Sequence, residues 1–428
     1  MEASIISLIV FGIVIVFWIT DKLPSSLVAM AGCLAMALLG ICSLPEAMKG
    51  FTNDIVFLVV GMDILGNALQ NTGAAKRIGQ LAVQLSHDNE QRFLFFACII
   101  AGIMSAFLSD STVAALFMII CKSVTSSSKN IRMRNVAIPV CIAAIVGGTM
   151  TLVGSTPQLV AQSALTEIAG VEGFSMFSFT PIGAPAFIIY IVFTVFIGYP
   201  LGKRIWGGRK EEEIELTSIM IKEAGSTDVQ WNKKKAPIVL VVLGIMVICF
   251  VFEFLSLGTI SMAGGIVCIL TGCITTKESY KKMNWNMIIW LAGCFSLANV
   301  LTISGANEQM TQFLAQFLNP NMSPFMFFAI VTLFSLVITQ FMANTTVVVL
   351  ILPIILPLAT LMGISPYPVA MGVIMGASFA FNTPLACAHI AFSLVAGHKF
   401  SDYFRYTWML TIIEYIMLLI LIPLFFPL

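Results

Sequence analysis

A stretch of ninety residues, from Gln309 to His398, contains no Asp, Glu, Lys or Arg. Charged residues make up about a quarter of an ordinary soluble domain. A charge-free tract of this length is therefore not expected in a water-soluble fold. Over the whole chain of 428 residues, 59% are hydrophobic and 10% are charged. A helix of about 20 apolar residues crosses a bilayer, and a chain in lipid must satisfy its own backbone hydrogen bonds. The sequence therefore predicts an all-α, multi-pass (polytopic) integral membrane protein.

Shorter charge-free runs occupy much of the remaining chain. They cover residues 3–20, 23–45, 93–109, 135–166, 174–202, 236–252 and 283–307. Together the runs predict about ten to twelve spans plus two segments that enter the bilayer and return. Glu253 and Glu414 stand near the ends of apolar runs and are expected to reach the membrane interface. Because Met1-Glu2-Ala3 has no basic residue, we expect the first run to be a span and not a cleaved signal.

One long hydrophilic segment, residues 203–235, divides the chain into two halves. Cytoplasmic loops carry an excess of Lys and Arg, and this segment is rich in both, so it is predicted to be a cytoplasmic linker. The first half then covers residues 1–202 and the second covers 236–428. The formal net charge of +1 gives no indication of nucleic-acid binding.

The second half repeats three blocks of the first half in the same order. The pairs are 53–74 with 285–306 at a shift of 232, 109–113 with 343–347 at a shift of 234, and 155–157 with 382–384 at a shift of 227. Three blocks at nearly one period indicate an internal duplication. An odd number of spans per copy would invert the second copy, and inverted copies are common in transporters with broken helices.

Each half carries a short polar cluster inside an apolar run, namely Ser109 to Thr112 and Asn344 to Thr346. If a helix breaks at Asn344, the next half-helix begins with Thr345 and Thr346 as caps and with free backbone N–H groups. Such a helix start favours an anion. Carbonyl groups that end the preceding half-helix suit Na⁺. The alternative is an unbroken helix whose polar side chains bond to a neighbour. The duplication favours the break and predicts re-entrant hairpins near residues 91–120 and 322–357.

Asp110 is the acidic member of the first cluster. A carboxylate inside a membrane costs roughly 2.5–3.5 kcal/mol on insertion scales, so such a residue is a functional candidate. Asp110 is interpreted as a Na⁺ ligand or a proton carrier, with capping of the next half-helix through the Thr112 N–H as the alternative. Pro157 and Pro384 would end backbone bonding and leave carbonyls free. The sequence has no Walker loop, no HExxH motif and no nucleophile with a base, so we expect neither an enzyme nor an organic cofactor, and any pumping must use an ion gradient.

From about Asn53 to Arg405, these motifs resemble the divalent anion/sodium symporter family. That family lies within the wider ion transporter superfamily, which includes arsenite transporters and Na⁺/H⁺ exchangers. It carries Ser-Asn-Thr signatures at the tips of two oppositely oriented hairpins, where this chain has Ser109-Asp110-Ser111 and Ala343-Asn344-Thr345. Its Thr-Pro-Pro elements correspond to residues 155–158 and 382–385.

The resemblance implies an inverted repeat of about five spans plus one re-entrant hairpin per half, a scaffold and a moving transport domain, an elevator mechanism and a homodimer in a lipid bilayer. The bilayer expected is a bacterial cytoplasmic (inner) membrane. Na⁺ would be the coupling ion. Its ligands, carried over by position, would be Ser105, Ser109, Asp110 and Ser155 in one site and Thr339, Asn344 and Asn382 in the other. The small anionic substrate would bind between Ser109, Asp110, Thr156, Asn344, Thr345 and Thr383.

The chain departs from the family pattern at four places: Asp110 replaces the first Asn, Ala343 replaces the second Ser, and both second prolines are missing. Two functions follow. The first is a secondary transporter that moves a di- or tricarboxylate, or a similar oxyanion, with Na⁺ or H⁺. The alternative is an ion exchanger of the Na⁺/H⁺ type, in which Asp110 alternately binds a cation and a proton.

Overall fold

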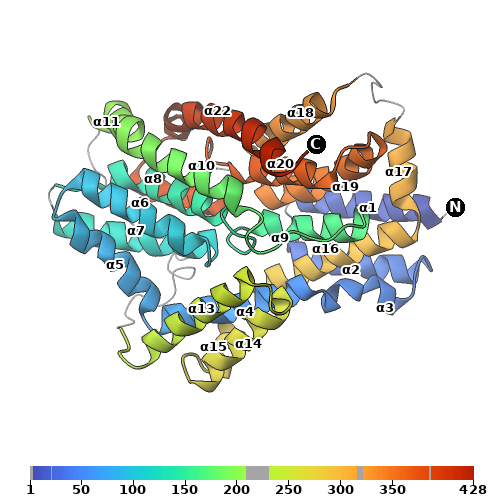
Figure 1. Cartoon of the computed structure of the whole chain (residues 1–428), viewed down its shortest axis with the longest axis horizontal. Helices are drawn as coiled ribbons and strands as arrows, with labels where there is room; N and C mark the ends of the chain where they lie inside the picture. The colour runs from blue at the N-terminus through green and yellow to red at the C-terminus, as the bar shows by residue number, and fades with distance from the viewer. Residues whose placement is uncertain (1–2, 21, 129, 209–230, 316–321, 385–386) are drawn as a thin grey trace.

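A computed structural model describes residues 3–20, 22–128, 130–208, 231–315, 322–384 and 387–428, and all regular structure within these ranges is helical (Figure 1). The first half consists of α1 (Ala3–Thr20), α2 (Ser25–Leu38), α3 (Leu44–Ala47), η1 (Lys49–Thr52), α4 (Asp54–Asn71), α5 (Ala74–Ser86), α6 (Glu90–Ser105), α7 (Asp110–Ser127), α8 (Met133–Gly148), α9 (Thr156–Ser163), η2 (Ala164–Ile168), α10 (Thr180–Phe193), η3 (Thr194–Gly198) and α11 (Tyr199–Trp206). Here η1 is a 3₁₀ turn, whereas η2 and η3 are π-helical.

The second half consists of α13 (Lys235–Val251), α14 (Leu257–Leu270), α15 (Thr276–Lys282), α16 (Trp285–Ile303), α17 (Ala306–Ala315), α18 (Pro324–Ile338), α19 (Asn344–Leu361), α20 (Pro366–Ser378), α21 (Ala388–Ala391), the 3₁₀ turn η4 (Phe392–Ala396) and α22 (Phe400–Phe425). The predicted linker falls mostly on residues 209–230, outside the described residues. Its two ends are helical, because α11 continues to Trp206 and α13 begins at Lys235.

Helices of the two halves begin at matching positions. Helices α2 and α14 start 232 residues apart, at 25 and 257, as do α3 and α15 at 44 and 276, and α5 and α17 at 74 and 306. The local chemistry recurs as well: Glu46 closes a capping box on Ser43, and Glu278 closes one on Thr275. Gly73 (φ 76°) and Gly305 (φ 73°) each supply the left-handed residue that ends one helix before the next begins.

The two halves interlock through these matching helices. Helix α2 packs against α16, and α14 packs against α4. A Cβ on Gly61 of α4 would lie 2.2 Å from the backbone of Ser261, and a Cβ on Gly293 of α16 would lie 2.5 Å from Ala29 Cβ. Positions 61 and 293, and positions 29 and 261, are each 232 residues apart, so the same close contact occurs twice. Only glycine permits such an approach at positions 61 and 293.

The outer faces of the terminal helices are apolar. Along α22 one side exposes Phe404, Trp408, Ile412, Ile416, Ile420 and Leu424, and α1 likewise exposes Ile5, Ile9, Ile13 and Val16. Water does not favour such continuous apolar stripes, whereas lipid does. Five helical segments of the described chain are long and apolar enough to cross a bilayer, or six if α4 and α5, bent by 60°, are one span. The chain is therefore a helical integral membrane protein, as predicted, while the count of ten to twelve spans stays a prediction.

The polar clusters belong to two helix triplets. Helices α6, α7 and α8 pack on one another and lie side by side at one end of the molecule (Figure 1). Helices α18, α19 and α20 pack on one another in the same way. Helix α9 lies between, where it contacts α16 and α19. These triplets position the two helix breaks.

Candidate functional site: two helix breaks in the membrane

The first break separates α6 from α7. Helix α6 ends at Ser105 and α7 begins at Asp110, where the sequence predicted the interruption. The Ser105 hydroxyl donates a hydrogen bond of 2.7 Å to Asp110 Oδ1, and both residues are buried. The hydroxyl of Ser155, the N-cap of α9, approaches the same carboxylate. Three of the expected Na⁺ ligands are therefore together.

Gly148, the last residue of α8, lies directly against this carboxylate, and Gly154, in the turn that follows, lies against Ser105. A Cβ on Gly148 would lie 1.8 Å from Asp110 Oδ1, and a Cβ on Gly154 would lie 2.7 Å from the Ser105 carbonyl oxygen. Gly147 makes a similarly close approach to the backbone of Gly102 in α6. The sequence explains this packing, because only residues without a side chain let α6, α7 and α8 meet at Asp110.

The second break, between α18 and α19, repeats the arrangement. The Thr339 hydroxyl donates to Asn344 Oδ1 at 3.3 Å and to the Ala377 carbonyl at 2.8 Å. Thr339 and Asn344 stand 234 residues after Ser105 and Asp110, so the same side-chain contact joins the last hydroxyl before each break to the first residue after it. The first half presents a carboxylate at this place, and the second presents an amide.

The helices that follow the two breaks, α7 and α19, have no side-chain cap at their first residue. Helix α7 follows Ser109 and α19 follows Ala343, and no side chain of these N-cap residues bonds to a backbone N–H group. The exposed Ser109 instead donates to the Thr112 hydroxyl at 2.9 Å. The expectation that Thr345 and Thr346 cap the second half-helix was wrong, because α19 begins one residue earlier and both threonines, half-buried, lie in its first turn.

Gln340 connects the second break to the loop after α20 through hydrogen bonds. The sequence did not suggest this role. Its side chain donates to the Phe379 carbonyl at 3.0 Å and accepts from the Asn382 N–H at 3.0 Å, while its backbone carbonyl accepts from the Thr383 hydroxyl at 2.5 Å. In the first half, Thr151 makes the same bond to the Ala106 carbonyl.

By contact, Thr383 therefore corresponds to Thr151, which lies 232 residues earlier, and not to Thr156, as the shift of 227 had it. Thr156 is half-buried and begins α9. The shift of 232 that the block 53–74 shares with 285–306 was the sequence signal that pointed to Thr151.

Asn382 does not offer its side-chain oxygen to the second break. Its Oδ1 accepts hydrogen bonds from Thr407 at 2.6 Å and Thr411 at 2.8 Å, both in α22. A carbonyl oxygen has two lone pairs, so both are used. Of the expected second Na⁺ site, Thr339 and Asn344 are in contact, whereas Asn382 is held by α22.

A family model described as a citrate transporter matches residues 15–376. The chain belongs to the citrate transporter family. This membership confirms the expected place in the ion transporter superfamily, and it makes the chain a transporter and not an enzyme.

Two relatives and one solved structure show how far the likeness extends. The chain is 30% identical over 190 residues to the uncharacterized transporter YfbS of Escherichia coli, a match that covers 44% of this chain and only 31% of YfbS. It is 21% identical over 403 residues to the sodium-dependent dicarboxylate transporter SdcS of Staphylococcus saprophyticus, covering 86% of this chain and 76% of SdcS. The YdaH transporter of Alcanivorax borkumensis shares the fold, with a TM-score of 0.63, 12% identity and coverage of 91% of this chain and 87% of YdaH.

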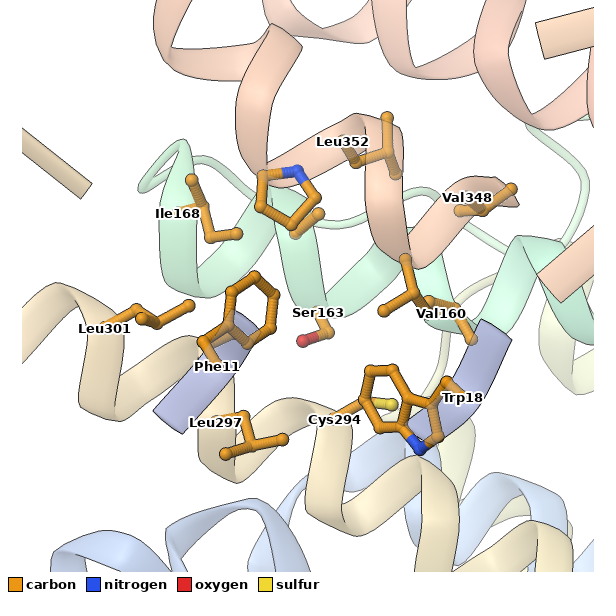
Figure 2. A pocket seen from close by; sticks show the side chains of 14 residues that line it. Phe11, Trp18, Val160, Ser163, Ile168, Cys294, Leu297, Leu301, Val348 and Leu352 are labelled. Carbon is orange, nitrogen blue, oxygen red and sulfur yellow. The ribbon is translucent and has the colours of Figure 1, made fainter. Parts of the chain in front are cut away.

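Within the described part of this citrate transporter family member, cavities lie between helices of the two halves. An apolar cavity of about 30 Å³ is lined by residues of α1, α9, η2, α16 and α19, among them Phe11, Trp18, Val160 and Leu352 (Figure 2). In this conformation the space suits a few water molecules at most and is too small for a di- or tricarboxylate. A polar cavity of about 200 Å³ is lined by residues that include Lys49, Asn53, Glu167 and Asn299.

The acidic residues expected at the interface differ in their positions. Glu253 is exposed just beyond the end of α13. Glu414 is buried within α22, and the expectation for it was wrong. The reason is that α22 begins at Phe400, well before the apolar part of its sequence, so Glu414 falls in mid-helix.

Proposed function

We propose that the chain is a secondary active transporter that carries a di- or tricarboxylate, or a similar small anion, across the membrane with Na⁺ by alternating access. The observation that carries the proposal is the duplicated contact at the two helix breaks, Ser105 with Asp110 and Thr339 with Asn344. Paired interruptions in the two halves of a transporter are the best structural pointer to its binding site. The family description and the name of SdcS support the substrate class and the ion.

Each group at the breaks has a chemical role in this proposal. Hydroxyl, carboxylate and amide oxygens suit a hard cation, so Ser105, Ser109, Asp110 and Ser155 would hold one Na⁺. Thr339 and Asn344 would hold a second, joined by Asn382 in a conformation that frees it from Thr407 and Thr411. The uncapped first turns of α7 and α19 direct N–H groups and the positive ends of the helix dipoles toward the anion.

The hydroxyls of Ser109, Thr156, Thr345 and Thr383 would complete the anion site, with Asp110 and Asn344 beside it. A Na⁺ at Asp110 would neutralise the carboxylate that otherwise repels the anion. We further propose an inverted repeat with re-entrant hairpins, an elevator movement of a transport domain against a scaffold, a homodimer and a bacterial inner membrane as its location. The matching helix starts and the reciprocal contacts of α2, α4, α14 and α16 support the repeat.

The buried carboxylate of Asp110 favours one alternative. A residue that binds a cation and a proton in turn would make the chain an exchanger of the Na⁺/H⁺ type, with Asp110 as the exchanging group. The amide at Asn344 cannot take that part, so an exchanger would use the first break alone.

Uptake by purified protein in proteoliposomes separates the two functions. Labelled succinate and citrate are offered with a Na⁺ gradient and a pH gradient imposed one at a time, and protein-free liposomes give the background. Uptake driven by inward Na⁺ supports the symporter. Absence of carboxylate uptake, together with Na⁺-driven proton release that Asp110→Asn abolishes, would refute the symporter and establish the exchanger.

A further inference from the structure

Glu414 is a carboxyl group in the middle of a membrane-crossing helix. Helix α22 extends over 26 residues, and the side that carries Trp408, Ile412 and Ile416 is exposed to lipid. Glu414 is on the opposite side, with Thr407 and Thr411, and its side chain is 0% exposed. Ionisable side chains at such depth are rare and usually serve ion or proton transport.

Neither carboxyl oxygen of Glu414 has a hydrogen-bond partner within the described part of the chain. Helices α10, α11 and α20 pack against α22, and α18 reaches it through Tyr415. The titratable groups on these helices and on α22 itself are Tyr190, Tyr199, Lys203, Arg204, Tyr367, Asp402, Tyr403, Arg405, Tyr406 and Tyr415.

Several of these side chains form hydrogen bonds or ion pairs with groups other than Glu414. Tyr190 donates to the Pro139 carbonyl, Tyr367 to the Glu172 carbonyl at 3.0 Å and Tyr415 to the Ala329 carbonyl at 2.9 Å. The amine of Lys203 pairs with Glu90, 3.5 Å away. An ionised carboxylate without a partner is far more costly in an apolar interior than the neutral acid. The burial of Glu414 without a partner therefore favours its neutral form over the carboxylate.

The position of Glu414 connects it to the second helix break. Thr411, three residues before it, donates to Asn382 Oδ1, and the Asn382 N–H donates to Gln340, next to Thr339. Loss of the proton would place a negative charge one helical turn from the Thr411 hydroxyl. If that hydroxyl then donates to the carboxylate, Asn382 loses one of the two hydrogen bonds that hold it to α22 and keeps the bond from Thr407. A proton on Glu414 thus favours the contact that fastens α22 to the second break.

We propose that Glu414 is a proton-binding residue of the transport cycle, neutral in the conformation described here and deprotonated in a conformation that opens it to water. In that step the carboxyl O–H bond breaks, the proton passes to water and the electron pair stays on the carboxylate. The proposal adds a coupling residue to the proposed transport function and rests on it. The proton site itself is measurable without any substrate.

Infrared difference spectroscopy of the purified protein, titrated with pH, tests the proton directly. The carbonyl stretch of a protonated carboxylic acid should be present in the wild type, lose intensity in Glu414→Gln and keep its full intensity in Glu253→Gln, which makes the same chemical change on an exposed residue. An unchanged band in Glu414→Gln would overturn the proposal.

A second measurement uses the wild-type protein and so does not depend on the folding of a variant. Dicyclohexylcarbodiimide, an apolar reagent for protonated carboxyl groups, should label the peptide that contains Glu414, and the label should fall as the pH rises. Absent or pH-independent label at Glu414 would contradict the proposal.

In proteoliposomes, Na⁺-driven uptake should lose its pH dependence in Glu414→Gln and keep it in Glu253→Gln. An unchanged pH profile in Glu414→Gln would exclude a part in coupling. If the wild type transports no carboxylate, the proposed function fails, while the infrared and labelling results still decide whether Glu414 binds a proton.

Discussion

Replacement of Gly148 by alanine tests the geometry of the first break. The added Cβ would lie 1.8 Å from Asp110 Oδ1, whereas an ordinary C···O contact is about 3.3 Å or more. The carboxylate therefore has to move by about 1.5 Å, a shift that breaks its 2.7 Å bond to Ser105. Overpacking of this kind costs about 1–3 kcal/mol, and a hydrogen bond to a charged group is worth about 1.5–3 kcal/mol.

If Na⁺ binds at Asp110, a loss of this size lowers Na⁺ affinity by about 10- to 100-fold, since each 1.4 kcal/mol is a factor of ten. Na⁺ that binds the folded state raises its thermal midpoint in proportion to the logarithm of concentration over Kd. Unfolding midpoints of the purified protein over a Na⁺ titration should therefore show a curve displaced to higher Na⁺ in Gly148→Ala.

Gly244→Ala is the matched control, because a Cβ at position 244 has no neighbouring atom within 4 Å. Its Na⁺ response and Na⁺-driven uptake should equal those of the wild type. A Gly148→Ala protein that elutes as the wild type does and keeps the wild-type Na⁺ response would refute the placement of the cation at Asp110.

Three further outcomes are expected. Asn344→Ala should abolish uptake while the protein stays folded by size-exclusion chromatography; wild-type uptake would remove Asn344 from the site. Asp110→Asn, which gives both breaks an amide, should weaken Na⁺ activation of uptake by about tenfold, because a neutral hydrogen-bonding oxygen binds less strongly than a charged one; an unchanged activation curve would contradict that role. Outside the membrane, the Thr275 hydroxyl and backbone N–H lower the pKa of Glu278, so this contact stabilises the fold at neutral pH and is lost as pH falls through the lowered pKa. Thr275→Ala should therefore show a smaller drop in unfolding midpoint on acidification, and identical pH profiles would contradict the contact.

The sequence predicted the helical membrane fold and the places where two helices break. Both predictions rest on strong physical terms, the exclusion of charge from lipid and the cost of polar groups such as Asp110 and Asn344 inside it. Asn344 and Asp110 indeed begin their helices. The structure explains why glycine occupies both position 61 and position 293. A backbone or Cβ atom of the other half lies so close to each that no side chain would fit.

The parts that were missed depend on contacts between segments far apart in the chain. Gln340 bonds to a loop about forty residues later, and no local pattern indicates that partner. The Thr-Pro pattern at 156 and 383 suggested a shift of 227 between the halves. The hydrogen bond from the Thr383 hydroxyl to a backbone carbonyl, however, is the counterpart of the bond made by Thr151 and not of any bond made by Thr156. Glu414 seemed close to a span end because the charges at Lys399, Asp402 and Arg405 concealed the start of α22 at Phe400.

The exchange of partners among α2, α4, α14 and α16 has a consequence for the origin of the chain. If 232 is subtracted from the numbers of the second half, Ser261 becomes position 29 and Gly293 becomes position 61. Position 61 of each half then contacts position 29 of the other half. That is the reciprocity of an isologous interface, in which two identical subunits offer the same patch to each other. A single-copy ancestor could have made both contacts between separate chains. Fusion of the two genes would then have turned a dimer interface into the interior of one protein, which leaves each copy free to change alone, as Asp110 and Asn344 have done.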